Sequence, residues 1–169
     1  MAFTAFALVR AVHIIFSALW AGGAFFTAFI LGPHMRAAGP AAGPFMATIM
    51  RRGGIAWYPL TVGAIALLAG GSTLGQGEYT SDSIGNGPFI VLMAGVALAV
   101  LAYLVGLFVM FPTERKLKAL VRSMPAQGPP APDMQAQFQQ LGMKQGKTGV
   151  ALAGMLALAL LCMTLWRLF

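Results

Sequence analysis

Four long apolar stretches constrain the fold of this sequence more than any other feature. They cover residues 4–32, 55–75, 88–111 and 148–168, and each is long enough to cross a bilayer, which takes about 20 apolar residues. A segment inside hydrocarbon must satisfy its backbone hydrogen bonds internally, so each stretch is predicted to be an α-helix. The sequence therefore predicts an all-α fold, an integral membrane four-helix bundle in which residues 1–169 form a single transmembrane domain.

The composition supports a multi-pass membrane protein. Hydrophobic residues make up 59% of the chain and charged residues only 9%, whereas a soluble domain carries about 25% charged residues. The chain therefore lacks the polar surface that a soluble protein needs. We expect its apolar faces to contact the lipid bilayer.

Positive charge is concentrated on one side of the predicted membrane. The connection between the second and third stretches contains Glu78 and Asp82 but no Lys or Arg. Nine of the 11 basic residues lie in the connections on the other side: Arg36, Arg51, Arg52, Arg115, Lys116, Lys118, Arg122, Lys144 and Lys147. The positive-inside rule places that side in the cytoplasm and both termini outside, on the periplasmic face of a bacterial inner (plasma) membrane. The net charge of +7 is thus explained by topology and by attraction to anionic lipid head groups, without nucleic acid as a partner.

The connections carry helix-ending and linker signals. Gly32 and Pro33 are predicted to end the first helix, and Pro59 suits the first turn of the second. The segment "FMATIM" is expected to lie as a short amphipathic piece at the interface. The third helix is expected to continue into the cytoplasm after residue 111, followed by a Pro-rich linker over about 123–146.

One ionisable side chain lies well inside the first apolar stretch. His13 shares roughly one helix face with Arg10, one turn nearer the outer surface, and with Trp20, two turns further in. Ionisable residues within a membrane span are rare and point to a functional site. A neutral imidazole is a good ligand for iron or copper, Arg10 is placed to meet a haem propionate, and Trp20 would pack beside the macrocycle. Alternatively, His13 forms a hydrogen bond with a Ser, a Thr or a backbone carbonyl group of a neighbouring helix.

If the ligand is haem, several arrangements can complete the iron coordination. His34 is the only other histidine, and it lies 21 positions after His13, about 30 Å away along a helix. Met93 and Met163 lie at a depth comparable to that of His13, and His/Met ligation of haem iron is established chemistry. A homodimer that brings two copies of His13 together, or a five-coordinate iron, would also serve. The sequence leaves these possibilities open.

A second group of candidate ligands lies at the cytoplasmic interface. His34 and Met35 are followed by Met46 and Met50, which share a face if their segment is helical. An imidazole with soft thioethers can hold Cu(I), so His34 is a candidate metal ligand there.

This sequence lacks the signatures of several enzyme and transporter classes. It contains no nucleophile elbow, no P-loop and no pair of carboxylates within a span. The apolar stretches also contain no Asp or Glu, which argues against a proton-coupled transporter.

The stretch "LVRAVHIIFSALWAGGAFFTAFILGPHM" resembles the opening helix of a group of four-helix membrane proteins. This group includes the HemJ-type protoporphyrinogen oxidases and the membrane domain of copper-resistance protein D. The resemblance rests on His13, Trp20, the small residues 21–23 and His34. It implies haem b binding at His13 by analogy with the HemJ-type enzymes, or copper handling by analogy with the copper-resistance proteins. HemJ-type sequences carry an arginine late in the first helix, which "FTAFILGP" lacks, so we carry over haem binding but not the oxidase activity.

Three functions are therefore expected, in order. The first is haem b binding through His13, with a part in membrane electron transfer or redox chemistry. The second is a non-catalytic accessory subunit of a larger respiratory or photosynthetic membrane complex, in which His13 forms an interhelical hydrogen bond. The third is copper handling.

Overall fold

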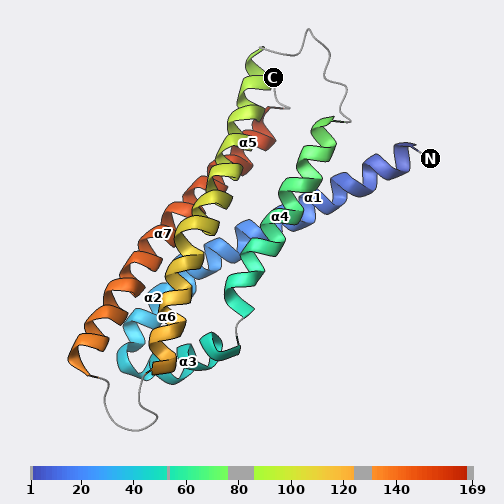
Figure 1. Cartoon of the computed structure of the whole chain (residues 1–169). Coiled ribbons are helices and arrows are strands. Elements are labelled where there is room, and N and C mark those ends of the chain that lie inside the picture. The colour runs from blue at the N-terminus through green and yellow to red at the C-terminus, as the bar shows by residue number, and fades with distance from the viewer. Residues whose placement is uncertain (1, 53, 76–85, 124–130, 167–169) are drawn as a thin grey trace.

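The computed structural model describes residues 2–52, 54–75, 86–123 and 131–166. All of these residues except Asn86, Ala131 and Trp166 are helical, and none is in a strand (Figure 1). Four helical segments are long and apolar enough to cross a membrane, which confirms the four predicted spans. They cover Ala5–Ala38, Trp57–Gly75, Gly87–Ser123 and Pro132–Leu165.

Each of the four segments contains one or more helical elements. The first consists of α1 (Ala2–Phe25), the π-helix η1 (Phe26–Leu31) and α2 (Gly32–Ala38), and a 3-10 turn η2 (Gly39–Ala42) leads into α3 (Gly43–Arg52). The second is α4 (Gly54–Gly75), and the third consists of α5 (Gly87–Val105), the π-helix η3 (Gly106–Met110) and α6 (Phe111–Ser123). The fourth is α7 (Pro132–Leu165).

The long helices form two antiparallel pairs. α1 packs along α4, and α5 packs along α7 (Figure 1). α2, α3, α6 and the first turns of α7 gather at one end, which we call the basic end because it carries Arg36, Arg115, Lys116, Lys118, Arg122, Lys144 and Lys147. α1 begins and α7 finishes at the opposite end.

The predicted end of the first helix at Gly32 and Pro33 is wrong, because the chain passes this proline without breaking the helix. Proline has no N–H to donate, and its ring clashes with the carbonyl group four residues earlier. The wider π-turn η1 lies directly before it, and the Gly32 N–H donates to the Thr27 carbonyl group, five residues back. η3 precedes Pro112 in the same way, with the Phe111 N–H bonded to the Gly106 carbonyl group. A π-turn therefore carries two of the spans past a proline.

The linker expected over 123–146 is largely wrong, since α7 begins at Pro132. Pro132 occupies the first helical position, where a missing N–H costs nothing. The Gln, Ala and Met residues that follow are good helix formers, so the helix continues into the fourth span. Residues 124–130 lie outside the described residues.

Two other local predictions are confirmed, and the placement of Pro59 in the first turn of the second helix is wrong. α6 continues the third span beyond residue 111, and the segment containing "FMATIM" is the helix α3. The Asn86 side chain caps α5 by accepting a hydrogen bond from the Phe89 backbone N–H at 3.0 Å. Pro59 lies inside α4, which begins at Gly54, instead of in its first turn.

Small residues form much of the buried core between the two helix pairs. Trp20 is its largest member, and its ring meets Tyr103 edge-on at 6.1 Å between centroids. The other buried members are Ala21, Val62, Ala66, Ala99, Ala102, Leu152, Leu156 and Ala159. Association of helices in lipid depends on close packing, which alanine and glycine permit.

Large side chains of α1 pack onto glycines of α4 at matching intervals. A methyl group at Gly63 would lie 2.9 Å from the Trp20 ring, and one at Gly70 would lie 2.7 Å from the His13 ring. His13 and Trp20 are two turns apart, as are Gly63 and Gly70, so the two antiparallel helices keep one register. This register places His13 against α4.

The α5–α7 contact predicts that alanine substitution at two glycines has very different effects on the free energy of unfolding. A methyl group at Gly95 would lie 2.9 Å from Cys162 Cβ and 3.1 Å from the Ala159 carbonyl oxygen, neither of which can move without its helix. We expect Gly95→Ala to lower the free energy of unfolding by about 1–3 kcal/mol. Gly154→Ala, where nothing lies within 4 Å, should be neutral or stabilising. Unfolding by sodium dodecyl sulfate in mixed micelles measures both, and equal effects would contradict the close contact.

Candidate functional site

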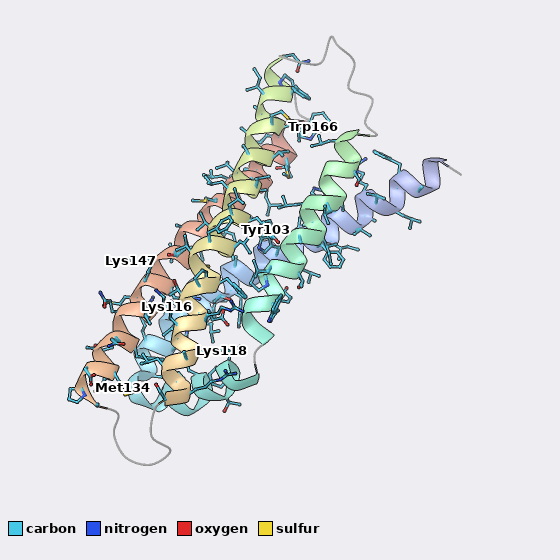
Figure 2. All side chains as sticks on the ribbon, in the orientation of Figure 1. Tyr103, Lys116, Lys118, Met134, Lys147 and Trp166 are labelled. Carbon is cyan, nitrogen blue, oxygen red and sulfur yellow. The ribbon has the colours of Figure 1, made fainter. Side chains whose placement is uncertain are left out.

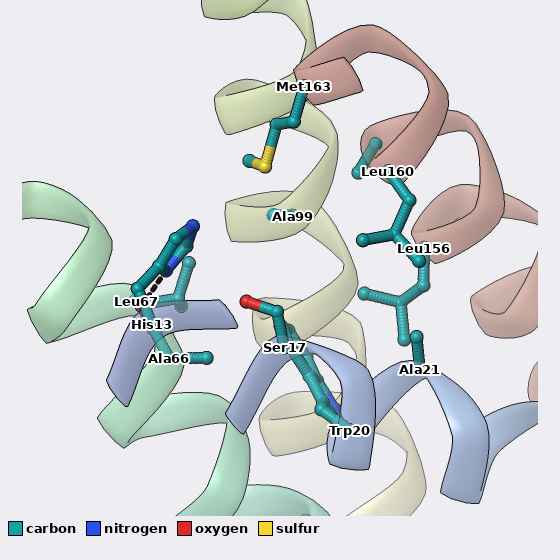
Figure 3. Close-up of a pocket in the computed structure, with 11 residues that line it drawn as sticks. His13, Ser17, Trp20, Ala21, Ala66, Leu67, Ala99, Leu156, Leu160 and Met163 are labelled. Carbon is teal, nitrogen blue, oxygen red and sulfur yellow. Dashed lines mark hydrogen bonds between the residues drawn. The ribbon is translucent and has the colours of Figure 1, made fainter. Parts of the chain in front are cut away.

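His13 is held by a hydrogen bond between helices. Its Nδ1 donates to the Ala66 carbonyl oxygen of α4 at 2.8 Å (Figure 3). The half-buried ring lies over Gly70. A carbonyl oxygen can only accept, so Nδ1 must carry the proton. In the neutral ring, Nε2 then carries the lone pair. The contact therefore fixes both the orientation and the tautomer of the imidazole.

The same hydrogen bond is compatible with two roles for His13. It is the contact expected if His13 is a packing residue that joins two helices. It is also the usual support of a metal-ligating histidine, which donates its second ring N–H to a carbonyl or carboxylate group. The difference between these roles lies in Nε2, which has no partner among the residues the structure describes.

A small cavity between the two helix pairs brings three of the predicted site residues together. Its volume is about 30 Å³, and all four long helices contribute to its wall. His13 and Trp20 line it from α1, and Met163 lines it from α7. Figure 3 shows the second ring nitrogen of His13 directed away from Ala66, on the side where Met163 extends its thioether. The remaining wall is apolar apart from Ser17.

The donor atoms of this cavity fit a haem iron, whereas its present volume does not hold the macrocycle. An imidazole Nε2 and a thioether sulfur are a known pair of axial ligands. A volume of about 30 Å³ accommodates roughly one water molecule, and sites for organic ligands measure about 300–1,000 Å³. Haem binding therefore requires the α1–α4 pair and the α5–α7 pair to stand farther apart beside His13.

The other two residues predicted for this site lie outside the cavity wall. Arg10 is half-buried on α1, one turn from His13 and closer to the start of the helix. Met93 is half-buried on α5. Of the two methionines considered as the second axial ligand, the structure thus brings only Met163 to the cavity that His13 lines.

The second predicted constellation is not assembled by any described contact. His34 is exposed, and its Nδ1 bonds to the Ile30 carbonyl oxygen of its own helix at 2.7 Å. Met46 packs against Leu117 and Val121 of α6. Within the described ranges, no group of three or more His, Cys, Asp or Glu side chains is arranged to hold a metal ion.

Sequence reasoning expected a backbone carbonyl group of a neighbouring helix as one possible partner of His13, and the structure shows such a contact. It did not identify the two groups that define the site. The Ala66 carbonyl group is a backbone acceptor, which no side-chain pattern reveals. Gly70 provides the space for the ring, and the signal that could have found it is the shared two-turn interval of His13–Trp20 and Gly63–Gly70.

Comparison with known proteins gave no match, either to protein-family models or to curated proteins and solved structures.

Two neighbouring glycines allow a test of the His13 geometry. Gly70→Ala would place a methyl group 2.7–2.8 Å from the ring, whereas Gly71 has nothing within 4 Å. We expect Gly70→Ala to displace the imidazole from the Ala66 carbonyl group and Gly71→Ala to leave it in place. In protein with ¹⁵N-labelled histidine and the background substitution His34→Gln, the ring nitrogen shifts should report an Nδ1–H tautomer that only Gly70→Ala perturbs. An Nε2–H tautomer in the parent protein would contradict the hydrogen bond.

Proposed function

We propose that this chain is a multi-pass protein of the inner (plasma) membrane that binds haem b through His13 and takes part in membrane electron transfer. The observation that carries the proposal is the 2.8 Å hydrogen bond from His13 Nδ1 to the Ala66 carbonyl oxygen. It leaves Nε2 as a lone-pair donor with no described partner, beside a cavity that Met163 also lines. The basic end faces the cytoplasm in this proposal, because positive charge favours that side.

The roles of the surrounding residues follow from their places. The Ala66 carbonyl group holds the imidazole, and Gly70 leaves room for the ring. Met163 offers a thioether as the second ligand, and Arg10, one turn away, offers a cation for a propionate. When bound, the haem iron would accept and return one electron. The largely apolar wall leaves room for only about one water molecule beside the donors.

A second candidate is favoured by the small size of the cavity. A cavity of about 30 Å³ holds no macrocycle, and in this case the hydrogen bond of His13 serves to join α1 and α4. The chain would then be a non-catalytic subunit of a larger respiratory or photosynthetic membrane complex. Its exposed apolar side chains would contact other chains as well as lipid.

The two histidines provide a matched pair of variants for the haem proposal. We expect protein from haem-replete cells to show Soret and α bands that change on addition of dithionite. His13→Ala should lose these bands, whereas His34→Ala should keep them, because His34 is exposed and its described hydrogen bond lies within its own helix. A haem-replete preparation without these bands, or with bands that survive in His13→Ala, would contradict the proposal. Co-purification with a multi-subunit complex, with no spectral change in His13→Ala, would favour the second candidate.

The two methionines test the second axial ligand independently. If Met163 ligates the iron, Met163→Leu should convert a low-spin spectrum to a high-spin one while haem is retained. Met93→Leu, a change of the same kind outside the cavity wall, should leave the spin state unchanged. Absorbance and low-temperature electron paramagnetic resonance measure the outcome. A spin-state change in Met93→Leu but not in Met163→Leu would show that Met93 is the second ligand and would contradict the assignment to Met163.

A further inference from the structure

A larger pocket lies at the basic end, between the third and fourth spans. Its volume is about 240 Å³, and it is separate from the residues around His13. One part of its wall is apolar and consists of Phe108, Val109, Pro112 and Leu141. The other part consists of Thr113, Lys116 and Lys144. We call it the lysine pocket.

The two lysines bring uncompensated positive charge to this pocket. Lys116 lies on α6 and Lys144 on α7, and both are exposed. Neither ammonium group forms an ion pair or a hydrogen bond with any residue the structure describes. On α6, the buried Glu114 lies two residues before Lys116 and does not line the pocket. On α7, the nearest acidic residue is Asp133, 11 residues before Lys144 and so about 16 Å away along the helix. The pocket therefore attracts an anion.

The apolar part of the wall distinguishes a lipid from a free anion. Phe108 is 70% exposed, and it lies on η3 inside the third apolar span. Lys116 follows eight residues later on the same helical segment, about 12 Å further toward the basic end. An apolar surface inside the span that leads to two cations at its end matches an acyl chain followed by a phosphate. Basic pockets between transmembrane helices are suited to anionic lipid head groups.

We propose that the lysine pocket binds one anionic phospholipid from the leaflet at the basic end. The phosphate lies between Lys116 and Lys144, and an acyl chain lies along Phe108. The Thr113 hydroxyl group donates to the Val109 carbonyl oxygen at 2.6 Å, so it does not donate to the phosphate. This inference is independent of the proposed haem site.

Charge-matched double variants test the proposal on the full chain. Lys116→Gln/Lys144→Gln removes the pocket cations, and Lys118→Gln/Lys147→Gln removes the same charge from residues of the basic end that do not line the pocket (Figure 2). We expect native mass spectrometry to detect one phosphatidylglycerol retained by the parent protein and by the control variant. The pocket variant should bind it about thirtyfold more weakly, since each lysine near the membrane surface contributes about a factor of five.

Three further measurements exclude simpler explanations. Equal losses in the two double variants would show only a general attraction to negative lipid and would overturn the site. Phe108→Ala should also weaken retention of phosphatidylglycerol, because it removes the apolar wall. If inorganic phosphate displaces the lipid at equal free concentration, the pocket recognises the phosphate alone and the proposal fails. Melting followed by tryptophan fluorescence, in phosphatidylcholine vesicles with and without phosphatidylglycerol, checks that all variants are folded.

Discussion

The close approach of α1 to α4 determines the geometry of the rest of the bundle. Glycines of α4 receive the rings of His13 and Trp20, and the His13–Ala66 hydrogen bond adds a polar contact at the same interface. Because lipid provides no hydrophobic drive for helix association, this interface depends on shape and on the hydrogen bond. Once it forms, Trp20 is fixed against Tyr103 of α5, which joins one helix pair to the other.

This arrangement gives His13 a structural role whether or not it binds a cofactor. The hydrogen bond to Ala66 uses one nitrogen and leaves the other with no described partner. A buried polar atom without a partner lowers stability. This free-energy cost is smaller for His13, because the ring is half-buried and lies at a water-sized cavity. The electron-transfer proposal and the packing-subunit alternative therefore differ in whether Nε2 binds iron and whether the space beside it opens to hold a haem.

The sequence predicted the four spans and the position of His13 within the first, because apolar length and an isolated ionisable residue are local signals. It failed at Gly32 and Pro33, where a π-turn accommodates a proline that otherwise ends a helix. It also failed at Pro132, where a proline begins a long helix instead of lying in a linker. A backbone carbonyl group of a neighbouring helix was among the expected partners of His13, but the side-chain pattern does not show which carbonyl group it is. The sequence also could not show that Met163, and not Met93, lines the cavity, because this depends on how α7 packs against α5.

The two π-turns also rotate the helix faces at the basic end, about the helix axis, relative to the faces of the same spans in the membrane core. A π-turn includes an additional residue, and one residue corresponds to about 100° around a helix axis. The face that α6 directs at α3 and α7 is therefore not a continuation of the face that α5 directs at α7. A helical wheel drawn straight through Gly106–Met110 would assign the lysines of α6 to the wrong side. A change of one residue in the length of such a turn would therefore rotate the charged face of the basic end by about 100° and leave the core between the helix pairs packed.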